Sequence, residues 1–272
     1  MKKSGSLIAA IVFIATAVAA SNAKPDQGEK PKKDNDAPAF VTDRPDVSEG
    51  SQTTQRGMVQ IELGLRQNQQ PGGVKNYFID DLIRIGIKER WELRVGGSAF
   101  AYTHSPTLRR AGTAPFYLGL KKNFAEAAGA RPSMGWLLNL NLPAPGRTFN
   151  TGRVDGNVLF LLNKQLTEKA DVEFNLGPGV NWDPAAGTYF RNATYALTVS
   201  YFPTKAYRFY GEGFGSVPGE KAGRASANAG FGLQWYNYAR LNAIDLSVTT
   251  AITGLSRQTN RASLALGYSI MR

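Results

Sequence analysis

The sequence predicts an all-β fold, an up-and-down antiparallel transmembrane β-barrel of about 12 strands. Apolar and polar residues alternate in short segments from residue 58 almost to the end of the chain. This two-residue period is typical of strands that separate two different environments. Tight turns and longer, Gly- and Pro-rich connections join the segments in alternation, and no segment of comparable strength has the period of a helix. An even strand count with short turns at one rim is the pattern of a membrane-spanning barrel.

The first 23 residues have the layout of a secretory signal peptide. Two lysines precede an apolar run over residues 7–20, and Ser21-Asn22-Ala23 supplies a small-x-small cleavage site. The run is short for a membrane-spanning helix. Residues 24–39 are rich in Lys, Asp and Pro and almost free of apolar side chains, which predicts a disordered leader.

Residues 40–57, FVTDRPDVSEGSQTTQRG, are polar and have no apolar period. The first half of this segment contains the cluster Thr42, Asp43, Arg44, Pro45 and Asp46. Proline fixes its own φ and biases the preceding residue toward an extended conformation, which holds Arg44 between two carboxylates. An even strand count places both termini at the periplasmic rim. We therefore expect this segment to fold back into the periplasmic mouth as a partial plug, because a lumen of this size is narrow.

The barrel is expected over residues 58–272, with strands at 58–66, 78–87, 91–102, 116–124, 133–143, 155–166, 170–182, 194–202, 207–215, 227–236, 241–252 and 263–271. In the third strand, the period places Ala99 and Ala101 on the apolar face and Phe100 on the polar face. The connections at 88–90 and 167–169 are tight. A soluble β-sandwich or lipocalin-like barrel has the same alternation with the apolar face inward, so alternation alone does not decide.

Three features favour the membrane barrel. Charged residues and glycines share the polar face, and short and long connections alternate regularly along the chain. Aromatic residues gather toward strand ends, as in an interfacial girdle. The aromatic residues are Tyr77, Phe78, Trp91, Phe116, Phe124, Trp182, Tyr201, Phe202, Tyr207, Trp235 and Tyr236.

Strand parity predicts which polar side chains point into the lumen. They are Gln60, Glu62, Arg66, Arg84, Glu92, Arg94, Lys121, Asn139, Asn141, Glu173, Asn175, Arg208, Glu212, Asn228, Gln234 and Asp245. These side chains either form ion pairs and hydrogen bonds with one another and so neutralise the interior, or they line a path for solutes and set its selectivity. Within it we expect a network of Glu62, Arg84 and Arg94 across the first three strands.

Other chemistry finds little support in the sequence. The chain has no cysteine and one histidine, His104, in a predicted outer loop beside Ser105 without a nearby carboxylate. We therefore expect no enzymatic activity, no cofactor and no metal site, and we interpret Asp80 and Asp81 as solvated rim charge. The net charge of +11 fits anionic lipid headgroups better than nucleic acid in an exported chain. The expected partners are outer-membrane lipid, small solutes and the barrel-assembly machinery, and the oligomeric state stays open.

The stretch TDRPDVSEGSQTTQRGMVQIELGL resembles the start of a bacterial outer-membrane family of transporters linked to the meta pathway of phenol degradation. The matching residues are Thr42, Asp43, Arg44, Pro45, Asp46, Gly57, Gln60, Glu62 and Gly64, followed by Arg84, Gly86, Trp91, Glu92, Leu93, Arg94 and Pro143. The similarity covers nearly all of residues 40–270. One departure is the ending Ile270-Met271-Arg272, where barrels of this kind usually end on an aromatic residue used in assembly.

The resemblance implies a Gram-negative outer-membrane barrel for passage or uptake of small, hydrophobic or aromatic molecules. The alternative from a different class is a structural or adhesive barrel with a closed lumen and partner-binding outer loops.

Overall fold

The computed structural model describes residues 40–143, 149, 152–219, 225–253 and 261–272. The signal peptide and the leader predicted from the sequence lie outside the described residues. Among the described residues, no helix has the length and apolar character needed to cross a membrane.

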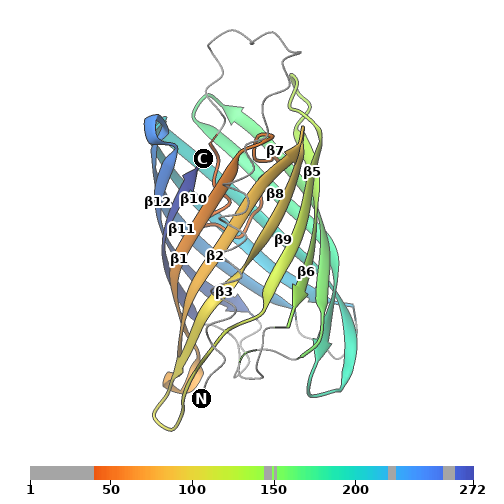
Figure 1. Ribbon diagram of the computed structural model, residues 1–272, viewed down its shortest axis with the longest axis vertical. Helices are drawn as coiled ribbons and strands as arrows, with labels where there is room; N and C mark the ends of the chain where they lie inside the picture. Colours follow the sequence, from red (N-terminus) through yellow and green to blue (C-terminus); the bar gives the residue numbers. More distant parts are fainter. Residues whose placement is uncertain (1–39, 144–148, 150–151, 220–224, 254–260) are drawn as a thin grey trace. The chain divides into compact units, whose positions relative to one another are not determined.

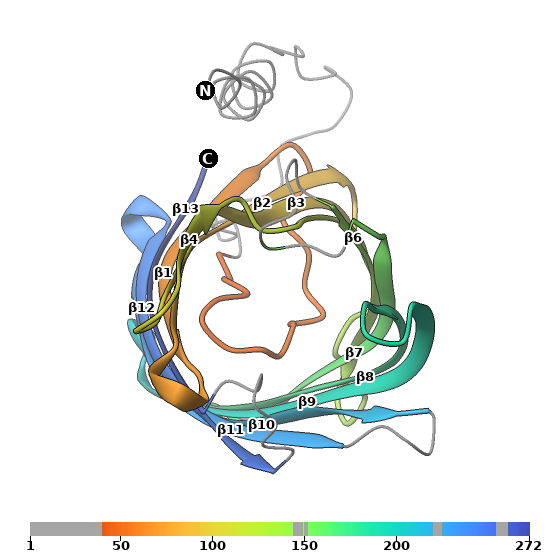
Figure 2. The ribbon, with the colours of Figure 1, turned by 90° about the horizontal axis from the view of Figure 1, so that it is seen from below.

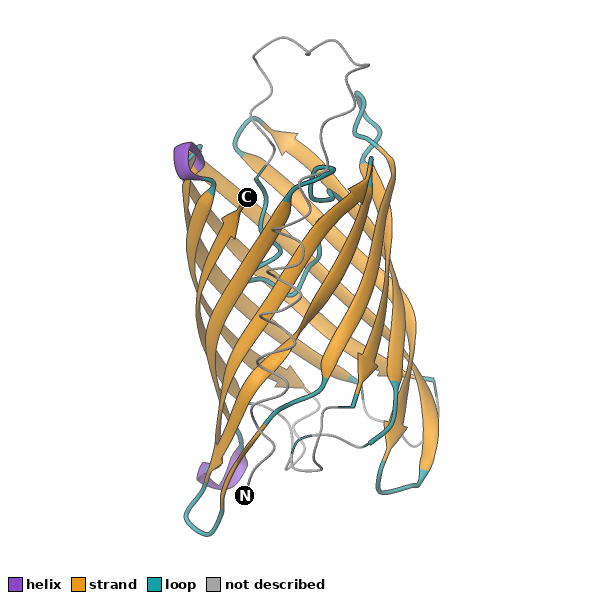
Figure 3. Ribbon diagram, in the orientation of Figure 1, coloured by secondary structure: helices purple, strands orange, loops and turns teal. Residues whose placement is uncertain are grey.

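Nearly all of the described chain from residue 59 onward is β-structure (Figure 3). The strands are β1 (Val59–Gln69), β2 (Lys75–Lys88), β3 (Trp91–His104), β4 (Arg109–Gly112), β5 (Phe116–Ala125), β6 (Ser133–Leu142), β7 (Asp155–Thr167), β8 (Ala170–Asp183), β9 (Thr188–Thr204), β10 (Tyr207–Pro218), β11 (Ser226–Asn237), β12 (Asn242–Thr253) and β13 (Ala262–Met271). Two single-turn 3-10 helices, η1 (Pro71–Gly73) and η2 (Tyr238–Arg240), lie in connections.

Twelve of these strands close into one antiparallel barrel. From β5 to β13 each strand pairs with the next strand along the chain, β3 pairs with both β2 and β5, and β1 joins β2 to β13 and so closes the ring (Figures 1 and 2). The predicted twelve-stranded up-and-down barrel is confirmed. The short β4 pairs only with β3 and lies within a connection that the sequence predicted to be a loop without strands.

The two rims of the barrel differ. Connections at 88–91, 167–170 and 204–207 form one rim, which we call the short-turn rim; the C-terminus lies there too, because Val59 and Arg272 exchange backbone hydrogen bonds of 2.7 and 2.8 Å. The opposite, long-loop rim carries η1 and the connection that contains β4.

The apolar face of the sheet points outward. Leu63, Leu246 and Leu266 keep 46–50% of their surface exposed. On the inner face, Glu62 and Gln234 are 0% exposed. A water-soluble barrel would bury its apolar face and expose its charges, because charged side chains are costly to bury. The inverted arrangement is that of a barrel that spans a lipid bilayer.

Aromatic side chains lie near both ends of the outer wall. Trp91 packs edge-on against Trp136 at 5.7 Å near the short-turn rim, and Trp182 packs against Tyr189 at 5.1 Å near the long-loop rim. Some of the predicted girdle residues face inward instead. The ring of Phe78 lies 4.3 Å under the guanidinium of Arg66, and Tyr236 is buried.

A β-bulge reverses the alternation in β3. Ile79 pairs with Phe100 and Asp80 pairs with Ser98, so the intervening Ala99 has no partner across the ladder. Its N–H donates to Asp81 Oδ1 at 3.2 Å. Because a bulge adds one residue to one strand, every later side chain changes face. Phe100 is 45% exposed and Ala101 is buried, so the sequence assignment of these two faces was wrong.

The outward apolar face predicts a depth-dependent cost of charge. Leu266 lies near the middle of β13, paired with Leu65 and Leu246. We expect Leu266→Arg to lower the free energy of unfolding in lipid vesicles by ~2–4 kcal/mol. The matched control is Leu166→Arg, because Leu166 is 57% exposed but lies beside the short-turn rim, where the same change costs ~0–1 kcal/mol. Equal effects of the two changes in denaturant titrations would contradict a bilayer-spanning wall.

Candidate functional site

Residues 40–57 lie inside the barrel and follow its inner wall (the orange coil in Figure 2). We call these residues the lumen segment. Apart from a parallel bridge between Arg56 and Gly86, the segment has no regular secondary structure. The Arg44-Pro45 peptide bond is cis. The hydrogen bonds of the segment therefore go largely to side chains of the wall, which makes the inner surface of the barrel and the segment one polar assembly.

Asp43 is the centre of the first charge cluster. Its Oδ2 lies 2.8 Å from Arg94 Nη1, 2.8 Å from Lys121 Nζ and 3.4 Å from Arg84 Nη2. All three cations are at most 2% exposed. Glu49 adds a second carboxylate from the segment, 2.6 Å from Arg94. Buried cations are strongly destabilising without anionic partners, so the segment supplies charges that the wall requires.

The two segment carboxyl groups share their cations and titrate together. Burial alone would raise the pKa of Asp43, but the charges of Arg84, Lys121 and Arg94 hold that pKa well below its usual range. Burial, together with the charge of Asp43, raises the pKa of Glu49 to about 7. Asp43 is therefore the carboxyl group of the pair that holds its negative charge, and Glu49 is the one that is protonated more readily.

Asp46 makes the second charge cluster with Arg208 of β10. Arg208 Nη1 and Nη2 donate to the two carboxylate oxygens at 3.1 and 2.8 Å. Such a two-bond pair fixes orientation as well as charge. Arg208 also donates to Ser200 at 2.9 Å and Gln234 at 2.8 Å. In the ring of strands, β10 lies across the barrel from β3, which carries Arg94 of the Asp43 cluster. The Asp46–Arg208 pair therefore anchors the lumen segment to the other side of the wall.

Arg44 lies against a stretch of wall that has no side chains. Gly64 and Gly267 are directly paired between β1 and β13. A Cβ at either glycine would overlap the Arg44 guanidinium, so only glycine leaves room for it. Arg44 Nε lies 3.6 Å from Asp245 of β12, the neighbouring strand. Gly64, one of the residues that carry the family resemblance, thus has a steric role in seating the segment.

From Val47 onward the segment contributes mainly backbone N–H groups and hydroxyl or amide side chains to its contacts with the wall. Ser48 and Thr198 are hydrogen-bonded at 2.6 Å, and Ser51 donates to Ser133 at 2.8 Å. Both the N–H and the hydroxyl of Thr54 donate to Glu92, at 2.6 and 2.8 Å. Further contacts include a Glu49 N–H bond to Asn175 at 2.6 Å, a Val47 N–H bond to Glu212 at 2.8 Å and a Gln52 bond to Asn163 at 3.1 Å.

A small apolar cluster lies where the segment enters the lumen. Phe40 is 2% exposed and packs edge-on against Tyr236, 6.0 Å between ring centroids. Met271 and Ala243 complete the cluster. The methionine near the C-terminus, which departs from the aromatic ending expected for such barrels, thus faces inward and helps to bury the start of the segment.

The structure brings most of the sequence-predicted lumen residues together. Arg84 Nη1 lies 3.2 Å from Glu62 Oε1 and Arg84 Nη2 lies 3.0 Å from Glu92. Arg94 joins these residues through Asp43 and a 3.9 Å approach to Glu92. Among the described residues, Glu62 and Arg94 form no direct ion pair. Lys121, Glu173, Arg208, Glu212 and Asp245 are buried on the inner wall.

Several predicted lumen residues bond to other residues of the wall, and Asn228 donates to the Phe214 carbonyl at 3.4 Å. Arg66 pairs with Asp80 at 2.7 Å, and Asn139 donates to Asn157 at 3.2 Å. Asn141 is exposed near the long-loop rim. The interpretation of Asp80 as rim charge was wrong, because Asp80 lies within β2 and also accepts a 2.5 Å bond from Ser98.

Sequence reasoning missed the partners that the second half of the segment finds. Ser48, Glu49, Ser51 and Thr54 carry no local pattern, and their partners lie 38–150 residues away. Asp43 and Asp46 were the only feature of the segment that pointed to partners in the wall, because buried carboxylates require cations nearby. Among the described residues, no group of three or more His, Asp or Glu has a metal-binding arrangement.

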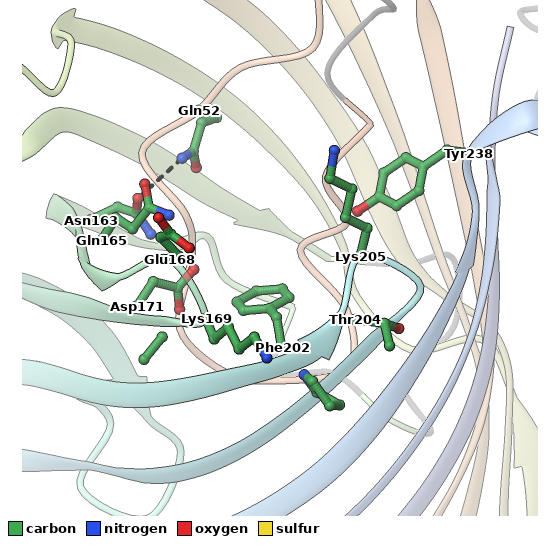
Figure 4. Close-up of a pocket in the computed structure, with 12 residues that line it drawn as sticks. Gln52, Asn163, Gln165, Glu168, Lys169, Asp171, Phe202, Thr204, Lys205 and Tyr238 are labelled. Carbon is green, nitrogen blue, oxygen red and sulfur yellow. Dashed lines mark hydrogen bonds between the residues drawn. The ribbon is translucent and has the colours of Figure 1, made fainter.

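The lumen segment borders two cavities. One, of about 770 Å³, opens near the short-turn rim and is lined by Gln52 of the segment together with Lys169, Phe202, Lys205 and Tyr238 (Figure 4). The other, of about 390 Å³, lies toward the long loops and is lined by Val47 and Glu49 of the segment and by residues of β7 to β11. The segment thus forms part of the wall of both.

These features define a membrane-spanning barrel whose lumen is occupied by its own N-terminal segment. The family described as "Putative MetA-pathway of phenol degradation" matches residues 42–263. The chain belongs to this family. The match begins within the lumen segment and extends into β13, so it covers both parts of the assembly.

Solved structures support the same fold. The crystal structure of the COG4313 outer membrane channel from Pseudomonas putida F1 is similar with a TM-score of 0.63 at 13% identity, covering 84% of this chain and 100% of that one. The NanC porin is similar with a TM-score of 0.56 at 8% identity, covering 76% of this chain and 98% of that one. At these identities the likeness concerns the fold. A search of curated proteins finds no match.

The Asp43 cluster predicts that one carboxylate controls the docking of the segment. We expect Asp43→Asn to weaken docking by ~3–5 kcal/mol, because the change leaves buried cations uncompensated. Hydrogen exchange across residues 40–57 should quicken while the barrel strands keep their protection. The control is Glu89→Gln, since Glu89 is 83% exposed on the short-turn rim. Unchanged exchange in Asp43→Asn would contradict the assigned role.

Proposed function

We propose that this chain is a Gram-negative outer-membrane channel for small, uncharged, hydrophobic or aromatic molecules, and that the lumen segment is its plug. In this proposal the signal peptide directs export and the short-turn rim faces the periplasm. The inner network of charges holds the plug, and the cavities on its two sides receive the solute.

The observation that carries the proposal is the cavity of about 390 Å³ on the long-loop side of the segment. Its lining mixes apolar groups such as Leu159 and Phe214 with amide groups such as Asn157 and Asn175. An apolar pocket with a few hydrogen-bonding groups suits a small molecule that has an apolar body and one polar substituent. The charges of the wall, in contrast, are mostly engaged with the segment and with each other.

The membrane location is supported by the outward apolar face and by family membership. Aromatic residues near both rims fit the two interfaces of a bilayer. The family description concerns phenol degradation, and an uptake channel for aromatic compounds would supply the substrates of such a pathway.

One specific observation favours a second candidate, a structural barrel with a permanently closed lumen. The segment makes buried ion pairs at both Asp43 and Asp46. Such contacts are strong enough to hold a plug in place without any passage. Flux measurements separate the two candidates.

We expect deletion of residues 40–56 to raise the entry of small sugars into proteoliposomes well above that of the intact protein. The reason is that the segment occupies the lumen and borders both cavities. The strands of the wall are paired with one another into a closed ring without it. Liposome swelling with solutes of graded size measures the change, and heat-modifiable gel migration verifies that the barrel is folded. Equal swelling rates with and without the segment would contradict the plug.

A disulfide test then asks whether the plug moves. The chain has no cysteine, and the hydroxyls of Ser48 and Thr198 are 2.6 Å apart, so S48C/T198C offers a single reversible staple. Loss of flux on oxidation indicates a mobile plug, and unchanged flux indicates a path around a fixed one. A folded intact protein and a folded deletion variant that both pass no solute support the closed structural barrel.

A further inference from the structure

Three basic side chains form a row across β2, β3 and β4 at the long-loop rim. His104, the last residue of β3 and the one histidine of the chain, pairs with Lys75 of β2 on one side and with Arg109 of β4 on the other. Directly paired residues of an antiparallel ladder have their side chains on the same face, with Cα atoms about 5 Å apart. We call Lys75, His104 and Arg109 the basic row.

The basic row lies on the outward face of the wall. Two residues before His104 in β3 is Tyr102, which pairs with Tyr77, and two residues earlier is Phe100, which pairs with Ile79. Alternate residues of a strand point to the same face. Phe100 and Ile79 are 45% and 42% exposed on the membrane-facing surface, so the basic row continues that surface toward the long loops.

The outer wall changes its chemistry in steps of two residues, about 7 Å each. Beyond the apolar pair of Ile79 and Phe100, the rings of Tyr77 and Tyr102 lie with centroids 6.2 Å apart, and the ring of His104 stacks on Tyr102 at 6.5 Å. Aromatic rings with a polar group are enriched at the interface of a bilayer. The order apolar, aromatic, basic is the order of acyl chains, interface and head group in a lipid.

The basic row has no acidic counterpart in its own part of the chain. Residues 63–79 and 93–125 contain no aspartate and no glutamate. In the part of the chain that the structure describes, neither Lys75 nor Arg109 takes part in an ion pair. At the short-turn rim, in contrast, Arg90 lies 3.1 Å from Glu126 and 3.8 Å from Glu89. Adjacent cations without an internal anion favour an external one.

We propose that the basic row is a docking site for a phosphate group of an anionic, acylated glycolipid, the lipid A type that fills the outer leaflet of a Gram-negative outer membrane. The two tyrosines lie at the level of the interface, and the apolar wall beyond them receives the acyl chains. This proposal rests on the outer-membrane location and on the orientation in the proposed function, in which the long-loop rim faces outward.

The side chains of the row suit a phosphate on an acylated lipid. The planar guanidinium of Arg109 can bind two phosphate oxygens at once, and the ammonium of Lys75 adds a point charge. Both side chains have apolar stems that lie along an apolar surface while their heads reach the head-group layer. A zwitterionic lipid would bring its own ammonium group next to these cations, and a free phosphate ion would gain nothing from the apolar wall.

The site also joins β4 to the rest of the wall. In the described chain β4 pairs with β3 alone, and the turn between them is closed by the Ser105 N–H, which donates to the Leu108 carbonyl at 2.8 Å. A phosphate bound by both Lys75 and Arg109 would connect β2 with β4 across β3. The docked lipid would therefore hold this hairpin against the outer leaflet.

A lipid-binding titration tests the site. The folded mature protein in a non-ionic detergent is titrated with bisphosphorylated lipid A. We expect K75Q/R109Q to weaken binding about 25-fold, because each cation near an anionic lipid surface contributes a factor of about 5. The matched control, K88Q/R110Q, removes the same two charges. Lys88 ends β2 at the short-turn rim, and Arg110 pairs with Thr103 on the other face of the hairpin, so this control should bind lipid A like the parent.

Hydrogen exchange locates the bound lipid. Exchange of residues 104–112 should slow on addition of lipid A in the parent and in K88Q/R110Q, but not in K75Q/R109Q. Lipid A stripped of its phosphates should bind more weakly, and an equal concentration of inorganic phosphate should not compete. Equal weakening in the two double variants, tight binding of the stripped lipid, or full competition by inorganic phosphate would each overturn the docking site.

The outcome for the channel is read separately. A folded parent protein that binds lipid A through Lys75 and Arg109 but passes no solute in liposome swelling supports the docking site and contradicts the proposed channel function. A parent protein that passes solutes but binds no lipid A contradicts the docking site alone.

Discussion

The charge balance of the lumen is the constraint on which the rest of the structure depends. The barrel turns Arg84, Arg94, Lys121 and Arg208 into its narrow interior, where they are at most 6% exposed. Around Arg84, Arg94 and Lys121 the wall supplies two carboxylates, Glu62 and Glu92, and the lumen segment adds Asp43 and Glu49. Arg208 pairs with Asp46 of the segment at 2.8 Å and lies 3.6 Å from Glu173 of the wall. Because buried charges without partners are strongly destabilising, the wall and the segment are stable in this form only together.

This constraint gives the other sequence features their physical reasons. Gly64 and Gly267 leave the space that the Arg44 guanidinium occupies. Phe40 and Met271 bury the point at which the segment enters.

The barrel could be predicted from the sequence because strand alternation is a local signal, and parity then placed Glu62, Arg84 and Arg208 on the inner face. Parity failed where a local irregularity changed it. The Ala99 bulge exchanged the faces of Phe100 and Ala101, and nothing in the sequence WELRVGGSAFAY marks the extra residue. Inward-facing aromatics such as Phe78 and Tyr236 were mistaken for girdle residues because their stacking on Arg66 and packing on Phe40 are tertiary contacts.

The contacts of the lumen segment could not be predicted for a related reason. Ser48, Ser51 and Thr54 have no periodic pattern, and each finds its partner across a long sequence separation. The sequence placed Arg44 between Asp43 and Asp46, whereas in the structure Arg44 lies beside Asp245 and the two acids pair with cations of the wall. Which cation each acid meets is decided by the path of the segment around the closed barrel.

The central claim is that complementary buried charge holds the segment in the lumen, and a double-mutant cycle on Asp46 and Arg208 tests it most directly. Hydrogen exchange of residues 40–57 is measured for D46N, R208M and the double variant. The account predicts that either single change frees the segment, because R208M leaves Asp46 buried without its cation and D46N leaves Arg208 with only the more distant Glu173, at 3.6 Å. The double variant should lose much less than the sum of the two. Strictly additive losses, or full protection in every variant, would contradict it.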